Sequence, residues 1–119
     1  MRRPLHYASA KGHLHIVQCL LSKGAEVDSD DFFNSTPLMW TCLKGYLSVV
    51  NLLLDNGANI NHPNRFKNTP LHYASYNYKL HVVKILFQRG ADATLKNISN
   101  ETPLKFAKNI FYSSRVTYF

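Results

Sequence analysis

The stretch Thr69-Pro70-Leu71-His72-Tyr73-Ala74 belongs to a pattern that repeats through the 119-residue chain. Thr-Pro-Leu stands at residues 36–38, 69–71 and 102–104, an interval of 33, and Arg3-Pro4-Leu5 lies one interval earlier. Two further features recur at the same interval, a Gly-Ala pair and a pair of aliphatic residues: Gly24-Ala25, Gly57-Ala58 and Gly90-Ala91; Ile16-Val17, Val49-Val50 and Val82-Val83. Several independent positions that keep one interval predict tandem copies of one structural unit.

Each copy carries the local signals of two short helices. A threonine before proline is a good helix N-cap, and proline suits the first helical position because its fixed φ is already helical. In the second copy, Leu38, Thr41 and Cys42 follow at helical spacing and predict a short inner helix. Apolar residues spaced three or four apart over residues 48–56 predict an outer helix, and Gly57 suits the left-handed residue that ends it.

The polar stretches 28–35, 61–68 and 94–101 separate these helix pairs, and we expect each to form a hairpin-like loop, here called a finger. One helix pair is too small to bury its own apolar face. Its stability must therefore come from stacking on neighbouring copies.

The pattern resembles the ankyrin repeat, whose T-P-L-H-x-A signature residues 69–74 match in full, and the resemblance covers roughly residues 3–112. It implies an all-α repeat protein, an ankyrin solenoid of stacked helix-turn-helix units joined by fingers. We expect a single ankyrin-repeat domain over the whole chain. Its repeats would span approximately 3–35, 36–68 and 69–101, with a partial capping repeat at 102–119.

Three departures from the repeat pattern carry expectations of their own. Tyr78 replaces the glycine found between the two helices at Gly12 and Gly45. This should cost about 1 kcal/mol unless Asn77 takes the left-handed conformation instead. At the finger tip, where the family prefers glycine, Lys67 should tolerate that conformation less well than asparagine. The first unit also begins without a finger before it, so we expect the chain to be part of a longer array or multidomain protein.

Motifs for catalysis or cofactor binding are missing from the sequence. The five glycines never form G-x-G, which excludes a dinucleotide fingerprint and a P-loop, and no G-x-S-x-G or H-E-x-x-H occurs. Two cysteines are too few for a zinc site or a disulfide framework. We therefore expect no enzymatic activity, no cofactor and no metal.

Three residue types have structural interpretations. The resemblance implies that His6 and His72 make a hydrogen bond near the start of the inner helix. Cys19 and Cys42 are predicted to be buried thiols that fill core space. Trp40 shares its repeat position with Tyr7, Tyr73 and Phe106, and we expect this aromatic column to pack between stacked inner helices.

The net charge of +7 is unevenly distributed. Residues 1–59 carry five basic and five acidic residues, whereas residues 60–119 carry nine basic and two acidic ones. Such a field favours an acidic partner or a nucleic acid, although it is also consistent with a solvated basic surface. No apolar stretch exceeds Leu52–Leu54, so we expect no membrane insertion and a reduced intracellular, cytoplasmic or nuclear protein.

In the ankyrin family the partner contacts the concave side, which is formed by finger tips and exposed inner-helix positions. Carried over by position, this surface holds large apolar residues that a solvated finger would not need. The predicted partner-binding residues are Phe32, Phe33, Leu43, Lys44, Arg65, Phe66, Tyr76, Asn77 and Ile98. The alternative is that the phenylalanines fold back and cover neighbouring fingers.

The sequence therefore predicts a non-enzymatic protein–protein interaction module. Two alternatives stay open. The basic C-terminal half, with Tyr76 and Phe66 for stacking, could bind RNA or another oligonucleotide. The chain could also be the targeting or regulatory arm of a larger enzyme, as in acyl-CoA-binding proteins, palmitoyltransferases or ubiquitin-ligase adaptors that carry ankyrin segments.

Overall fold

The computed structural model describes residues 3–103 and 105, and in this part of the chain all regular structure is helical. Six short helices follow one another: α1 (Pro4–Ala10), α2 (Leu14–Ser22), α3 (Pro37–Lys44), α4 (Leu47–Asp55), α5 (Pro70–Tyr76) and α6 (Leu80–Gln88). Most of the predicted capping repeat at 102–119 lies outside the described residues.

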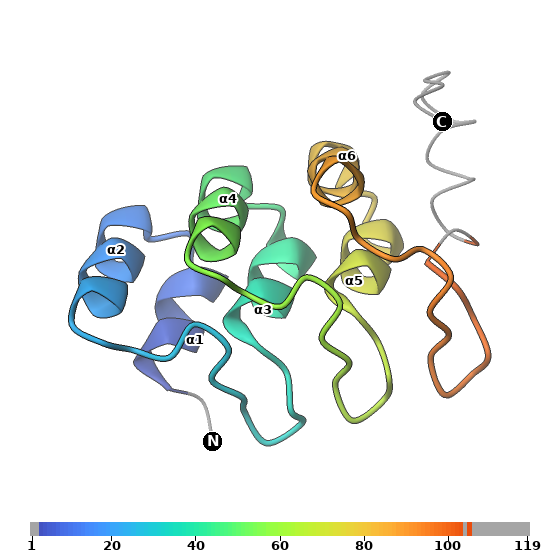
Figure 1. Ribbon diagram of the computed structural model, residues 1–119, viewed down its shortest axis with the longest axis horizontal. Coiled ribbons are helices and arrows are strands. Elements are labelled where there is room, and N and C mark those ends of the chain that lie inside the picture. The colour runs from blue at the N-terminus through green and yellow to red at the C-terminus, as the bar shows by residue number, and fades with distance from the viewer. Residues whose placement is uncertain (1–2, 104, 106–119) are drawn as a thin grey trace.

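The helices form two parallel rows (Figure 1). The inner row is α1, α3 and α5, each packed on the next, and the outer row is α2, α4 and α6. Three fingers project beyond the inner row, and the molecule is elongated, with extents of 42 × 27 × 21 Å. The structure thus confirms the predicted all-α solenoid of stacked helix pairs.

The inner helices begin as the sequence predicts. Thr36 and Thr69 accept hydrogen bonds from the amides of Met39 and His72 through their hydroxyl oxygens, each at 3.4 Å. A proline follows each cap at the first helical position. The outer helix expected over 48–56 spans Leu47–Asp55, a shift of one residue.

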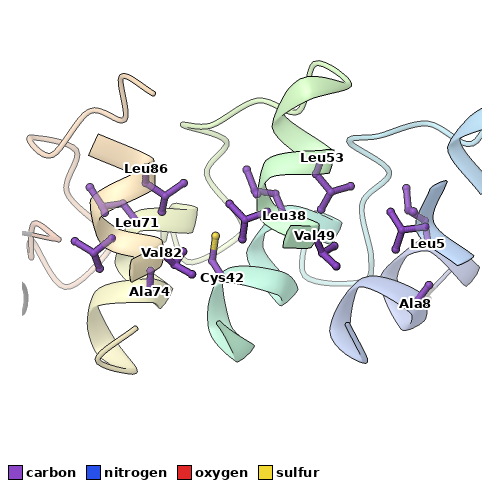
Figure 2. Close-up of a cluster of buried hydrophobic side chains, with 13 residues drawn as sticks. Leu5, Ala8, Leu38, Cys42, Val49, Leu53, Leu71, Ala74, Val82 and Leu86 are labelled. Atoms are coloured by element: carbon purple, nitrogen blue, oxygen red, sulfur yellow. The ribbon is translucent and has the colours of Figure 1, made fainter. Parts of the chain in front are cut away.

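The core is a continuous row of aliphatic side chains between the two rows of helices (Figure 2). Leu38, Leu53, Leu71 and Leu86 are at most 1% exposed. Full burial of one such side chain stabilises the fold by about 1.5–3 kcal/mol. The stacking of repeats therefore supplies the stability that no single helix pair could provide.

Stacking decides how deeply equivalent residues are buried. Ile16 in α2 is 50% exposed, whereas Val49 and Val82 at the same repeat position are 1% exposed because a preceding helix pair covers them. Pro4, Tyr7 and Leu20 lie on the same uncovered apolar surface as Ile16.

The expectation for the two cysteines is half right. Cys42 is buried in the core, and burial raises the pKa of its thiol. The prediction for Cys19 is wrong, since this residue is exposed. It occupies the outer side of an outer helix, where the equivalent Leu52 and Ile85 are only half-buried. The described residues also place no helix pair on the N-terminal side of α2.

The turn between α5 and α6 differs from one of our expectations. Tyr78 itself adopts a φ of 54°, and Asn77 keeps a φ of −102°. The proposed shift of the left-handed residue to Asn77 is therefore wrong. At the finger tips, Asn34, Lys67 and Asn100 have φ values of 58°, 58° and 61°, so lysine adopts the same conformation as asparagine.

No helix in the range 3–103 is long and apolar enough to cross a membrane.

Candidate partner-binding surface

Each finger is built around one buried Asp or Asn at a common repeat position. Asp31, Asn64 and Asn97 each accept, through Oδ1, the backbone amides two and four residues further on, at 2.9–3.1 Å. In each finger the amide of this residue also donates to the carbonyl four residues later, at 3.0 Å. Side chain and backbone together close the hairpin.

Adjacent fingers are hydrogen-bonded to one another. The amide of Arg65 donates to the carbonyl of Phe33 at 2.9 Å, and the amide of Ile98 donates to the carbonyl of Phe66 at 3.0 Å. These bonds hold the finger tips side by side, so equivalent side chains of successive repeats come into contact.

Phe32, Phe33, Phe66 and Arg65 form one cluster at the tips of the first two fingers. The rings of Phe33 and Phe66 lie 5.7 Å apart, and those of Phe32 and Phe33 lie 5.3 Å apart at nearly a right angle. The guanidinium carbon of Arg65 lies 5.0 Å from the centre of the Phe32 ring. The rings thus cover one another in part, yet Phe32, Phe33 and Phe66 stay 65%, 45% and 39% exposed.

A half-open cavity of about 130 Å³ lies beside this cluster. Phe33 and Phe66 bound it on the finger side, and Met39, Trp40 and Leu43 bound it from α3. The remaining lining residues are Ser35, Asn64 and Tyr73. The cavity therefore lies where a finger meets an inner helix.

The polar groups around this cavity are largely paired among themselves. The side-chain nitrogen of Asn64 donates to the Ser35 hydroxyl at 3.2 Å and to the Tyr73 hydroxyl at 2.7 Å. The indole N–H of Trp40 donates to Oδ2 of Asp31 at 3.0 Å. The cavity consequently offers mainly apolar surface to a ligand.

The equivalent groove one repeat further on has a different character. Here Tyr76 occupies the position of Leu43, and its hydroxyl accepts from Asn97 at 2.6 Å and donates to Asn68 at 3.1 Å. Burial, together with the nearby charge of Glu101, raises the pKa of Tyr76 to about 12. This groove is polar, and its central side chain is already engaged.

The nine predicted residues therefore fall into separate locations. Leu43 joins the aromatic cluster through the cavity, while Lys44 is exposed at the end of α3. Ile98, 64% exposed, and the half-buried Tyr76 belong to the second groove. Asn77 is exposed and donates from its side chain to the carbonyl of Tyr73 at 2.9 Å, which places it at the C-terminal end of α5.

Sequence reasoning missed two sets of residues. Trp40 and Tyr73, expected to pack between inner helices, line the cavity together with Met39. Phe106, at the same repeat position, lies outside the described residues. The finger residues Asp31, Asn64 and Asn97 were also missed. Their signal was present, since they recur at the repeat interval and Asp and Asn favour turns that bond to their own backbone.

The histidines at the repeat position have structural roles, as the resemblance implied. Nδ1 of His72 accepts the amide of Thr69 at 3.0 Å, so Nε2 carries the proton and donates to the carbonyl of Glu101 at 2.9 Å. Burial lowers the pKa of His72, which favours the neutral ring. His6 contacts the carbonyl of Ser35 in the same way, at 2.9 Å.

Asp31 places a charge at the base of the first finger. Burial acts to raise its pKa, but the amides of Ser35 and Phe33 and the Trp40 indole outweigh that effect, so the pKa lies below its ordinary value. Across residues 3–103, His, Cys, Asp and Glu side chains form no cluster that could hold a metal ion.

Basic residues of the C-terminal half lie on more than one face. Arg65 and Lys67 belong to the second finger, whereas Lys84 and Arg89 belong to α6 and its C-terminal end, in the outer row (Figure 1). Arg89 pairs with Asp55 at 2.6 Å. The charge excess is thus divided between the finger side and the outer side.

Comparisons with known proteins bear on this arrangement. A family model described as ankyrin repeats in three copies matches residues 2–64, and one described as ankyrin repeats in many copies matches residues 53–107. The chain is 50% identical over 38 residues to the probable E3 ubiquitin-protein ligase XBOS33 of Oryza sativa subsp. japonica. It is 49% identical over 37 residues to the serine/threonine-protein kinase VIK of Arabidopsis thaliana.

Each of these two matches covers only a small part of either protein. They cover 32% and 31% of this chain, and only 7% and 8% of the respective relatives. The family models, in contrast, together span nearly all of the described residues with the repeat that the helix pairs and fingers display. The chain belongs to the ankyrin repeat family.

Proposed function

We propose that this chain is a non-catalytic interaction module that binds a protein partner through its finger tips and the concave face of its inner helices. Ankyrin repeats are generally protein–protein interaction modules. The observation that carries the location is the cluster of Phe32, Phe33, Phe66 and Arg65 beside the apolar cavity. Aromatic residues and arginine are the types that contribute most binding energy at protein interfaces.

The aromatic rings of this cluster cover one another only in part, and much of their apolar surface stays exposed to solvent. Three rings that stay 39–65% exposed lie together with a cationic group above one of them. A folded chain gains nothing from such a surface in water, because hydration of apolar area is unfavourable. Burial against a partner supplies the missing stabilisation.

The distribution of basic residues favours a protein partner over a nucleic acid. Strong nucleic-acid binding needs many phosphate contacts along one face, and here the basic residues are divided between the fingers and the outer row, where Arg89 is paired with Asp55. Three basic residues of the fingers, Arg65, Lys67 and Lys96, are exposed, which suits an acidic partner.

Both matched relatives are much longer than the segment they share with this chain, and their names denote a ligase and a kinase. This supports the idea that the module acts as the interaction segment of a larger protein.

Phe33→Ala and Phe66→Ala should each weaken partner binding by about 1–3 kcal/mol, the range of aromatic anchors at an interface centre. Because both rings are partly exposed, each change should lower the free energy of unfolding by about 1 kcal/mol or less. The measurement is capture of partner proteins from lysate by the intact chain, quantified for each variant, with thermal melting of the same samples.

Lys84→Ala, on α6, is the matched control and should capture the partner as the unsubstituted chain does. Capture that depends on Lys84 and falls steeply with salt, while both phenylalanine variants behave normally, would reject the concave surface. A loss of many degrees in melting temperature for Phe33→Ala would show that the phenylalanines serve packing instead.

A further inference from the structure

We propose that the cavity between the first two fingers and α3 is a pocket for one apolar side chain of a partner peptide whose flanking residues are acidic. This inference rests on the proposed function and specifies the partner chemistry of the same surface. It is carried by the size of the cavity, by its contrast with the next groove and by the charges around it.

The volume suits a single side chain. The cavity measures about 130 Å³. An apolar cavity of about 150 Å³ in another protein holds one benzene molecule and stays dry when empty. A leucine, methionine or phenylalanine side chain is of this size, whereas a backbone segment or a nucleobase with its sugar is not. The cavity is also half-open toward solvent, so a side chain can enter from outside.

The lining favours an apolar occupant. Phe33, Leu43 and Phe66 supply carbon surface, and the amide of Asn64 already makes hydrogen bonds to Ser35 and Tyr73. The Trp40 indole N–H is likewise directed to Asp31. A polar side chain would lose its hydration on entry without gaining these partners, which is unfavourable.

The neighbouring groove is an internal comparison. Where the first groove has Ser35 and Leu43, the second has Asn68 and Tyr76, and the Tyr76 hydroxyl joins Asn68 to Asn97. The two grooves therefore lie at equivalent repeat positions and differ in their central side chain. Leu43 carries no polar group, so the first groove stays apolar.

The charges around the opening select the flanking residues. Lys44 follows the cavity residue Leu43 and is exposed, as are Arg65 and Lys67 on either side of the cavity residue Phe66. The acidic residues nearby are Asp31, which is buried and engaged by two amides and an indole, and Asp30, which is exposed. Exposed cations outnumber exposed anions, so acidic residues on either side of the inserted side chain would be attracted.

The experiment uses the intact chain and four synthetic peptides. The parent is Glu-Glu-Ser-Leu-Ser-Glu-Glu, and the others carry alanine at the centre, lysine in place of every glutamate, or both changes. Trp40 is the chain's only tryptophan and lines the cavity, so its fluorescence reports occupancy directly. Calorimetric titration of the same peptides supplies an independent dissociation constant.

The parent peptide should change the Trp40 emission in a saturable manner. The alanine-centred peptide should bind about tenfold more weakly, because burial of a leucine side chain is lost. The lysine-flanked peptide should bind at least about threefold more weakly at low salt, and that difference should shrink as salt screens the charges.

Two variants locate the site. Leu43→Tyr introduces the side chain of the second groove and should reduce binding of the parent peptide about tenfold. Lys67→Glu, at an exposed position, should reduce parent binding and improve binding of the lysine-flanked peptide. Lys23→Glu, at the end of α2 in the outer row, is the matched control and should change neither. Melting temperatures show whether each variant is folded.

Equal binding of the leucine and alanine peptides would overturn the pocket, and so would unchanged binding by a folded Leu43→Tyr chain. Equal or stronger binding of the lysine-flanked peptide would overturn the acidic partner. The inference also fails if no peptide changes the emission at millimolar concentration, or if a short oligothymidine changes it more strongly than the parent peptide does. If the peptides fail while protein capture still depends on Phe33 and Phe66, the pocket is wrong and the proposed function stands.

Discussion

Tyr78 adopts the left-handed conformation that glycine adopts at the two equivalent turns, with a φ of 54° beside 71° at Gly12 and 83° at Gly45. For a residue with a Cβ this conformation is unfavourable by about 1–2 kcal/mol. Tyr78 is 63% exposed, so its ring contributes little burial in return. The structure tolerates this strain because the remaining positions of the repeat specify the same turn.

Tyr78→Gly should therefore raise the free energy of unfolding. The relief of about 1–2 kcal/mol exceeds the roughly 0.4–1 kcal/mol that a glycine adds through the entropy of the unfolded chain, which leaves a gain on the order of 1 kcal/mol. Urea denaturation of both chains measures it. An equal or lower free energy of unfolding for the glycine variant would show that the tyrosine ring makes a stabilising contact.

Gly45→Ala provides the opposite comparison. A Cβ at Gly45 would come within 2.8 Å of Cδ of Lys79, in addition to its positive φ. This variant should be less stable than the unsubstituted chain in the same denaturation experiment.

Asp31 should make stability depend on pH at the acidic end. A carboxyl whose pKa is depressed on folding stabilises the native state above its unfolded pKa, near 3.8, and that contribution is lost as pH falls through the lower folded value. Burial opposes the depression, whereas the amides of Ser35 and Phe33 and the Trp40 indole produce it.

We expect Asp31→Asn to be less stable than the unsubstituted chain at neutral pH. The difference in free energy of unfolding between the two chains should shrink as the pH falls below about 4. Asn64 and Asn97 show that a neutral amide can accept the same two backbone amides, so the variant should still fold. Urea denaturation at a series of pH values tests this. A stability difference that does not change with pH would mean that the charge of Asp31 contributes nothing.

At the scale of elements, each finger is a separate hydrogen-bonded hairpin rather than an extension of the helices. Asn64 is 5% exposed and joins the first finger, its own finger and α5 through Ser35, Phe66 and Tyr73. The orientation of the aromatic cluster thus depends on one polar side chain at the base of the finger.

Asn64→Ala should lower the free energy of unfolding by about 2–3 kcal/mol, because it leaves buried amides and hydroxyls without partners. It should also weaken partner binding, since Phe33 and Phe66 would no longer be held together. Asn64→Asp should be milder, as Asp31 accepts the same pair of backbone amides in the first finger. Thermal melting and the capture assay separate the two effects, and a neutral result for alanine would show that the backbone alone shapes the finger.

At the scale of the whole molecule, the stack is covered unevenly. α4 packs on both α2 and α6, whereas the described residues place no helix pair on the N-terminal side of α2. Ile16 is consequently 50% exposed, whereas the equivalent Val49 is 1% exposed. In a stack held together by contacts between neighbours, local stability should follow this coverage.

Amide hydrogen exchange should therefore be faster in α1 and α2 than in α3 and α4 for the isolated chain. Ile16→Lys should leave exchange in α5 and α6 unchanged. Exchange measured by mass spectrometry on peptides from each helix tests this. Equal protection of α2 and α4 in a monomer would show that residues 3–9 cap the stack.

The repeat architecture could be read from the sequence because its determinants are local. The caps at Thr36 and Thr69, the prolines after them and the aliphatic spacing each act within one unit, and every unit packs only on its neighbours. The positions of the fingers followed from the same 33-residue interval, which also puts Phe33 and Phe66 at equivalent positions of adjacent fingers. No long-range topology had to be decided.

Whether each groove is apolar or polar depends on tertiary contacts that the sequence pattern does not specify. Leu43 and Tyr76 share one repeat position, yet one borders an apolar cavity and the other ties two asparagines together. Likewise Cys19 is exposed, although it lies on a helix that packs into the stack. Burial and side-chain pairing depend on which neighbours surround a position, and a one-dimensional pattern specifies the position without specifying those neighbours.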